Sequence, residues 1–181
     1  MNKKWLLSAG LAVVAGLASA QSVDVAKSQL SFTFSQEAVP VEGSFKKFAA
    51  TVNFDPAKPA AGNADIVIDL LSVNGGSPDA TTELAKPAWF DSAKSPKARF
   101  VASGFKAIDG GKFQAPGKLT LKGKTLPVVV TFTAKPAGKA LVLDGTAVVS
   151  RLQFLVGDGT WKDTDTVADA VNVKFHLQVN S

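Results

Sequence analysis

The chain has 181 residues and a formal net charge of +5, from 20 basic and 15 acidic side chains, and it contains one His and no Cys. The absence of Cys excludes disulfide bonds, thiolate chemistry and Cys-based metal sites. The basic residues are spread singly and are not clustered with aromatic residues, so we expect no nucleic-acid partner.

Residues 1–20 have the pattern of a secretory signal peptide. A basic start at Lys3 and Lys4 precedes an apolar run from Trp5 to about Leu17, and the segment ends on Ala-Ser-Ala at Ala20. A membrane anchor is the alternative, but the run falls short of the roughly 20 apolar residues that a spanning helix needs. We therefore expect cleavage after Ala20 and a periplasmic or secreted domain over residues 21–181.

Alternation of apolar and polar residues predicts strands along most of this domain. Near the end of the chain, Val, Val, Phe, Leu and Val alternate with Asn, Lys, His and Gln. Such strict alternation is typical of a strand with one buried face. The expected strands span residues 28–36, 41–54, 64–73, 98–108, 112–122, 126–133, 140–150 and 171–179.

Two glycines are expected to shape these strands. Gly123 supplies the positive φ that a tight hairpin requires between the strands on either side of it. Gly43 lies near Phe45, which is out of phase with Phe48. A bulge or bend at Gly43 would let both Phe side chains point inward.

One segment lacks strand alternation and is expected to be helical. Ser77 and Pro78 can start a helix, and residues 80–85 are good helix formers. We expect a second short helical turn at residues 88–91 and a short turn near residues 165–168. About eight strands in consecutive hairpins, with this insertion, predict an all-β fold, an antiparallel eight-stranded barrel with a short helical insertion.

The sequence carries no motif for catalysis or metal binding. His176 lies on the polar phase of the last strand, so we expect a solvated outer-face residue and not a general base. Without Cys or a second His, a zinc site would be unusual. The acids and glycines of residues 157–165 lack EF-hand spacing and predict turns. Trp161 in that segment would either plug one end of the barrel or cover a ligand as a lid.

The apolar faces of the expected strands are rich in Phe, of which the chain has 12, against 3 Trp and no Tyr. Phe carries no polar group, so these faces are purely apolar surface. Alternation cannot distinguish a packed interior from a lined cavity. On the physics of the residues alone, a filled core is favoured.

Several segments carry patterns that occur together, in this order, in one family. They are Val41-Glu-Gly-Ser-Phe-Lys-Lys-Phe48, Trp89-Phe-Asp91 followed by Pro96-Lys-Ala-Arg-Phe100, Gly117-Lys-Leu-Thr-Leu-Lys-Gly-Lys-Thr-Leu-Pro-Val128, and Arg151-Leu-Gln-Phe154. The domain resembles the YceI-like family of exported bacterial proteins over nearly its whole length.

The resemblance implies a lipocalin-like barrel whose interior holds a polyisoprenoid or similar amphiphilic lipid, with no cofactor and no enzymatic activity. A transient membrane contact is compatible with such a ligand, and the oligomeric state is left open. Arg151 and Arg99, the only arginines, could meet a polar head; the alternative for each is an ion pair at a strand end. The candidate ligand-binding residues are Phe32, Phe34, Phe45, Phe48, Phe100, Phe132, Arg151 and Trp161.

A second function is compatible with the same residues. If the Phe side chains fill the interior, the protein would be a non-catalytic periplasmic interaction or stress module with a filled barrel. The two hypotheses differ in one physical property, which is whether the barrel encloses free space.

Overall fold

The structure, a computed structural model, describes residues 21–180; the expected signal peptide, residues 1–20, lies outside the described residues. The strands are β1 (Gln21–Val23), β2 (Gln29–Gln36), β3 (Val39–Phe45), β4 (Phe48–Asn53), β5 (Asn63–Asp69), β6 (Val73–Asn74), β7 (Lys97–Ser103), β8 (Lys106–Ile108), β9 (Lys112–Leu121), β10 (Lys124–Ala137), β11 (Ala140–Ser150) and β12 (Ala170–Asn180). The α-helix is α1 (Pro78–Ala85), and 3₁₀ turns span Val25–Lys27, Pro59–Ala61, Leu70–Ser72, Leu152–Phe154 and Gly159–Lys162. Among the described residues, no helix has the length and apolar character needed to cross a membrane.

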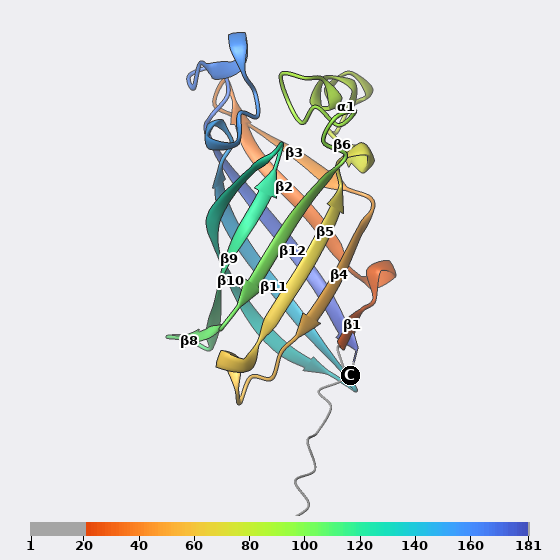
Figure 1. The fold of residues 1–181 in the computed structure, drawn as a ribbon, viewed down its shortest axis with the longest axis vertical. Coiled ribbons are helices and arrows are strands. Elements are labelled where there is room, and N and C mark those ends of the chain that lie inside the picture. Colours follow the sequence, from red (N-terminus) through yellow and green to blue (C-terminus); the bar gives the residue numbers. More distant parts are fainter. Residues whose placement is uncertain (1–20, 181) are drawn as a thin grey trace, which may run out of the picture.

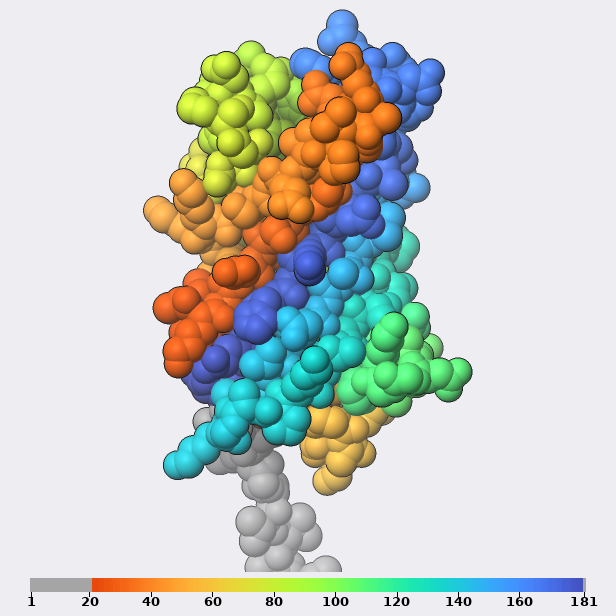
Figure 2. Space-filling view, turned by 180° about the vertical axis from the view of Figure 1, so that it is seen from behind, coloured from red at the N-terminus to blue at the C-terminus, as the bar shows by residue number. Residues whose placement is uncertain are grey.

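The strands close into an antiparallel barrel (Figure 1). Three of its strands are each built from two consecutive segments, since β1 continues into β2, β3 into β4 and β5 into β6. β12 pairs with both β1 and β2. β1 pairs with β4, and β2 pairs with β3. On their other edges, β4 pairs with β5 and β3 pairs with β6. With β7, β9, β10, β11 and β12, the ring has eight strands in up-and-down order, which confirms the predicted fold. Figure 2 shows the strands inclined to the long axis, as barrel closure requires.

The expected strand over residues 41–54 is wrong in one respect, because the chain bends at Lys46 and Lys47 and not at Gly43. The neighbouring barrel strand is interrupted beside this bend by the 3₁₀ turn Leu70–Ser72, which separates β5 from β6. The amide of Lys46 donates to the carbonyl of Ser72 (3.1 Å), and the amide of Lys47 donates to its Oγ (2.9 Å). The two interruptions therefore satisfy backbone groups that a regular ladder would have paired.

Two other expected strands are also shorter in the structure. The strand over residues 64–73 ends at Asp69, whose carboxylate accepts a hydrogen bond from the Leu71 amide (3.0 Å) and begins a 3₁₀ turn. Residues 98–108 divide into β7 and β8 at Gly104, which has a φ of +68°. This left-handed residue changes the phase of the chain, and the following Phe105 is buried in the core.

α1 begins where the sequence predicts, because the Ser77 side chain accepts a hydrogen bond from the amide of Ala80 (3.2 Å). Residues 87–90 form hydrogen-bonded turns, in place of the short helical turn expected at residues 88–91. Asp91 has a left-handed φ of +50°, and its amide donates to the carbonyl of Lys86 (3.0 Å). A turn at residues 164–166 lies close to the one expected near residues 165–168.

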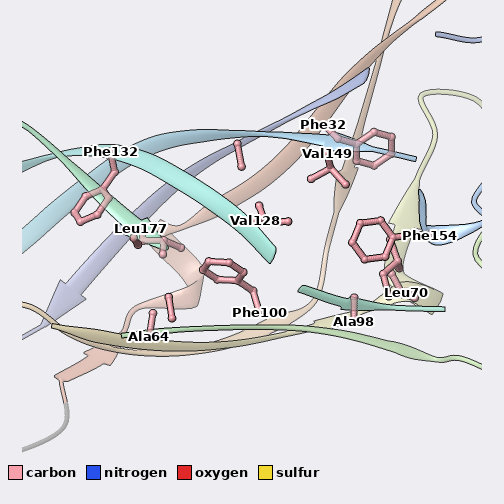
Figure 3. Close-up of a cluster of buried hydrophobic side chains, with 14 of the residues drawn as sticks. Phe32, Ala64, Leu70, Ala98, Phe100, Val128, Phe132, Val149, Phe154 and Leu177 are labelled. Atoms are coloured by element: carbon pink, nitrogen blue, oxygen red, sulfur yellow. The ribbon is translucent and has the colours of Figure 1, made fainter. Parts of the chain in front are cut away.

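The two ends of the barrel are closed in different ways. α1 and the loop between β11 and β12 lie over one end, at the top of Figure 1. The opposite end is packed with aromatic rings, and Figure 3 shows Phe132 far from Phe154 and Leu70 of the upper end. Neighbouring ring centroids in this cluster lie 4.9 to 5.8 Å apart, and its members are Phe54, Phe105, Phe113 and Phe132.

Replacing Phe54 with Ala tests the packing of this end. Phe54 is 2% exposed and contacts three other rings, so we expect the free energy of unfolding to fall by about 3–5 kcal/mol in urea titrations. Val148→Ala is the control on the outer wall, where Val148 is 65% exposed, and it should change that free energy by less than about 1 kcal/mol. A Phe54→Ala loss as small as the control would show that the cluster is not packed.

Candidate functional site

A cavity lies inside the barrel between these two ends. The cavity has a volume of about 190 Å³. Among the described residues, every lining side chain is a hydrocarbon except that of Arg151 and that of Trp89, whose ring carries one buried N–H group without a hydrogen-bond partner. A water molecule needs two or more polar partners to be held in place, whereas dry apolar cavities of comparable size bind apolar molecules. The cavity is therefore suited to a hydrocarbon group.

The interior is hollow because part of its wall is made of small side chains. Ala64, Ala98, Ala115 and Ala147 are buried on four different strands and face the cavity. Protein interiors are otherwise packed about as densely as organic crystals, so a Leu or Phe at these positions would occupy the bore. The sequence prediction of a filled core holds only for the aromatic cluster at the lower end.

The structure brings together most of the predicted ligand-binding residues. Six of them line the cavity, namely Phe32, Phe34, Phe45, Phe100, Phe132 and Arg151. Phe48 is partly buried against the core but is not among the lining residues. Trp161 lies outside the cavity, with its ring centroid 5.4 Å from that of Trp89, which does line it. The role of these residues in binding, apart from that of Arg151, stays a prediction.

The sequence reasoning missed two groups of lining residues. The first comes from the apolar faces of the strands and includes Leu30, Ile66, Val130 and Phe175, which the alternation placed on those faces. The second comes from the helix and loops over the upper end and includes Leu84, Trp89, Phe90 and Val156. Alternation gives no signal for such residues, because their direction depends on how loops fold over the barrel.

Two segments cover the upper end, and we call them together the cap: residues 75–96 and residues 151–169. The amides of Gly157 and Asp158 both donate to the carbonyl of Ala88, at 2.8 and 2.9 Å. Lys122, in the turn between β9 and β10, donates from Nζ to the carbonyls of Pro87 (2.6 Å) and Leu155 (2.7 Å). Hydrogen bonds therefore join the two cap segments directly and through Lys122.

Lys122 lies in a tight hairpin turn at the upper end. Lys122 and Gly123 have φ values of +48° and +75°, which are those of a tight two-residue hairpin. The sequence predicted the positive φ of Gly123. Partial burial lowers the pKa of the Lys122 ammonium, and the carboxylates of Asp91 and Asp158 oppose this shift.

Arg151 organises the second cap segment. Its side chain is buried, and its five N–H groups donate to five carbonyl oxygens at 2.6 to 3.0 Å. Burial lowers its pKa, and Asp169 opposes the shift, but an Arg side chain stays charged in proteins. The accepting carbonyls belong to Val156, Gly157, Trp161, Val167 and Ala168.

This arrangement corrects both roles considered for Arg151. All five donors are used within the cap, so none remains for the polar head of a ligand. It is also not an ion pair at a strand end, since the carboxylate of Asp169 accepts instead from Ser150 Oγ (2.7 Å) and the Leu152 amide (2.9 Å). The guanidinium carbon lies 5.8 Å from the ring centroid of Trp89, which links the two cap segments again.

Arg99 and His176 lie on the outer wall. Arg99 forms a bidentate ion pair with Asp65, at 2.9 and 2.6 Å, which confirms the ion-pair alternative for this residue and lowers the pKa of Asp65. His176 is half-exposed, which agrees with the outer-face position predicted from the sequence. Its Nδ1 lies 2.7 Å from Asp144 Oδ1. Within residues 21–180, no three His, Asp or Glu side chains gather to hold a metal ion.

Comparison with known protein families and sequences gives a consistent result. The YceI-like domain matches residues 21–179. A UPF0312 protein of Pseudomonas syringae pv. tomato is 30% identical over 139 residues, which are 74% of this chain and 69% of that protein. Protein YceI of Escherichia coli O157:H7 is 35% identical over 97 residues, which are 54% of this chain and 49% of the relative.

Solved structures share the fold. BcnA of Burkholderia cenocepacia is 45% identical, with a TM-score of 0.83 over 86% of this chain and 98% of that one. A polyisoprenoid binding domain from Saccharophagus degradans, implicated in plant cell wall breakdown, is 17% identical, with a TM-score of 0.70 over 90% of this chain and 98% of the domain. The second likeness concerns the fold alone.

Replacing Lys122 with Met tests how the cap is held. The variant removes two charge-assisted hydrogen bonds while keeping a long unbranched side chain, so the amides of Gly157 and Asp158 should exchange with solvent at least about tenfold faster. The measurement is amide hydrogen exchange read by NMR or mass spectrometry. Lys124→Met changes an exposed neighbour and should leave exchange in the cap unchanged. Equal exchange in both variants would mean that Lys122 does not join the cap segments.

The two arginines provide a matched pair for a second test. Arg151→Lys leaves at most three donors for five buried carbonyls, so the free energy of unfolding should fall by at least about 2 kcal/mol. Arg99→Lys changes an exposed ion pair and should lower it by less than about 1 kcal/mol. Urea titrations measure both values. Similar small losses would contradict the organising role of Arg151.

Proposed function

The chain belongs to the YceI-like domain family, and from that premise we propose that its barrel binds one polyisoprenoid or similar amphiphilic lipid in the cavity. The observation that carries the proposal is the apolar cavity between the aromatic cluster and the cap. The S. degradans domain with the same fold is described as binding a polyisoprenoid, which supports this choice of ligand class.

The cavity favours a ligand held by its hydrocarbon chain. Burial of apolar surface contributes about 25 cal/mol per Å² before the loss of chain and rigid-body freedom is subtracted. The only charged lining side chain among the described residues, that of Arg151, has every donor occupied by the cap. A charged or strongly polar head would be left without partners in the cavity, so the proposed ligand keeps its head outside it.

The proposal assigns the protein a binding or carrier role outside the cytoplasm. The signal-peptide pattern of residues 1–20 supports export and processing after Ala20, and a transient contact with a membrane would load such a ligand. The absence of a base or nucleophile motif in the sequence supports binding without catalysis. The alternative, an interaction module with a filled barrel, requires an interior that is packed throughout, and the space of about 190 Å³ argues against it.

A charge placed in the cavity wall tests the proposal. Phe34 lines the cavity and is only partly buried, so Phe34→Asp should leave the fold intact and abolish binding of geranylgeraniol to delipidated protein. Binding is measured through the intrinsic fluorescence of Trp89, which also lines the cavity. Val129→Asp, on the exposed outer wall, is the control and should bind as the wild type does. Delipidated wild-type protein that binds no geranylgeraniol would overturn the proposed function.

A further inference from the structure

Three inward-facing glycines lie directly beneath Phe rings along the cavity wall. Gly43 on β3 lies under Phe32, Gly117 on β9 under Phe100, and Gly145 on β11 under Phe175. In two of these pairs the glycine and the Phe are also direct cross-strand partners, Phe32 with Gly43 and Gly145 with Phe175. All three rings line the cavity.

The three glycines are required by space and not by backbone conformation. None of them has a positive φ, so the backbone at each position would accept any residue. A Cβ atom at Gly43 or Gly145 would lie 2.3 Å from the nearest ring carbon, and one at Gly117 would lie 2.5 Å away. Such contacts are far closer than van der Waals distance, so a methyl group and the ring cannot occupy these places together.

The glycines therefore allow the rings to lie against the wall. On its outer side each ring meets the backbone of the neighbouring strand, and on its inner side it meets the cavity. A methyl group on the glycine would displace the ring in the only free direction, which is into the bore. A fourth glycine, Gly62, makes a similar contact with Phe105, a ring of the aromatic cluster that also lines the cavity, but Gly62 lies in the connection before β5 and not within a barrel strand.

We infer that the Phe–Gly pairs Phe32–Gly43, Phe100–Gly117 and Phe175–Gly145 set the width of the cavity and thereby select chains with methyl branches over unbranched chains. The inference rests on the proposed lipid-binding function and adds a determinant of specificity to it. A methyl-branched isoprenoid chain is wider than a linear acyl chain of the same length, so narrowing the bore excludes the branched chain first.

Gly145 offers the cleanest test of this inference. The three atoms nearest to its Cβ would be two ring carbons of Phe175, at 2.3 and 2.7 Å, and the Cβ of Phe132, at 2.7 Å, with no backbone oxygen among them. At Gly43 and Gly117 a Cβ would also meet a backbone carbonyl oxygen, at 2.9 and 2.7 Å. Gly145→Ala is therefore the substitution whose effect is most directly a displaced ring.

The probes are phytol, a methyl-branched isoprenoid alcohol, and hexadecanol, the unbranched alcohol with the same main-chain length. Both are titrated into delipidated protein and followed by tryptophan fluorescence. Wild-type protein should bind phytol at least as tightly as hexadecanol. In Gly145→Ala the affinity for phytol should fall by about tenfold or more, the usual effect of a misfitting methyl group, and that for hexadecanol by much less.

Further variants separate a narrowed bore from a damaged fold. Gly145→Ala with Phe175→Leu removes the clash with the ring, while the contact with the Phe132 Cβ stays, so it should restore most of the affinity for phytol that Gly145→Ala loses. Phe175→Leu alone widens the bore and should shift the preference further toward phytol. This variant tests the inference on width even if Gly145→Ala does not fold. Gly110→Ala is the control for backbone strain. Gly110 has a left-handed φ of +74° and its Cβ would have no atom within 4 Å, so the preference between the two alcohols should stay unchanged.

The outcomes distinguish this inference from the proposed function. If wild-type protein binds both alcohols and the folded Gly145→Ala and Phe175→Leu variants show the wild-type preference, the inference on width is overturned while lipid binding stands. If wild-type protein binds neither alcohol, both fall together. A preference that moves in opposite directions in the two variants supports the inference.

Discussion

The pairing of β12 with both β1 and β2 is the constraint on which the rest of the molecule depends. It closes the sheet, and a closed ring of eight strands has a nearly fixed circumference. The volume inside is then set by geometry, and the inward side chains decide only how much of it they fill. Phe rings fill it at the lower end, while small inward residues, Ala and Gly, leave part of the remaining bore open.

Closure also determines what the upper end must accomplish. A hollow barrel with an apolar lining would expose that lining to water if its mouth were uncovered. The cap consists of α1, short 3₁₀ turns and loops, and its loops carry backbone groups without ladder partners. Arg151 resolves this problem by donating to five carbonyls at once, and Lys122 joins the two segments at their rim. The buried positive charge is thus a structural group of the cap, which leaves the cavity wall apolar.

The sequence predicted the features that depend on local pattern. Strict alternation identified β12 and the hairpin of β9 and β10, and Ser77 marked the start of α1. The features it did not predict depend on contacts between distant residues. The bend at Lys46 requires Ser72, and the role of Arg151 requires the carbonyls of the loop that follows it.

The hollow interior could be predicted from the sequence only in part. The phase of the alternation correctly placed Phe32 and Phe100 inward, but phase alone does not report volume. Ala98, Ala147 and Gly145 share that phase, and their small size was a signal for free space that the pattern of apolar residues concealed. Whether an inward Phe fills the bore or lies against the wall depends on the residue across the strand pair, which is known only once the register is known.

The central claim is that the barrel holds a lipid in its cavity, and native mass spectrometry of the protein isolated from its native source without detergent tests it most directly. The account predicts a species heavier than the bare chain by the mass of one lipid, which is released on denaturation and is found in the organic extract. A single species with the mass of the bare chain, together with an extract free of lipid, would contradict the account.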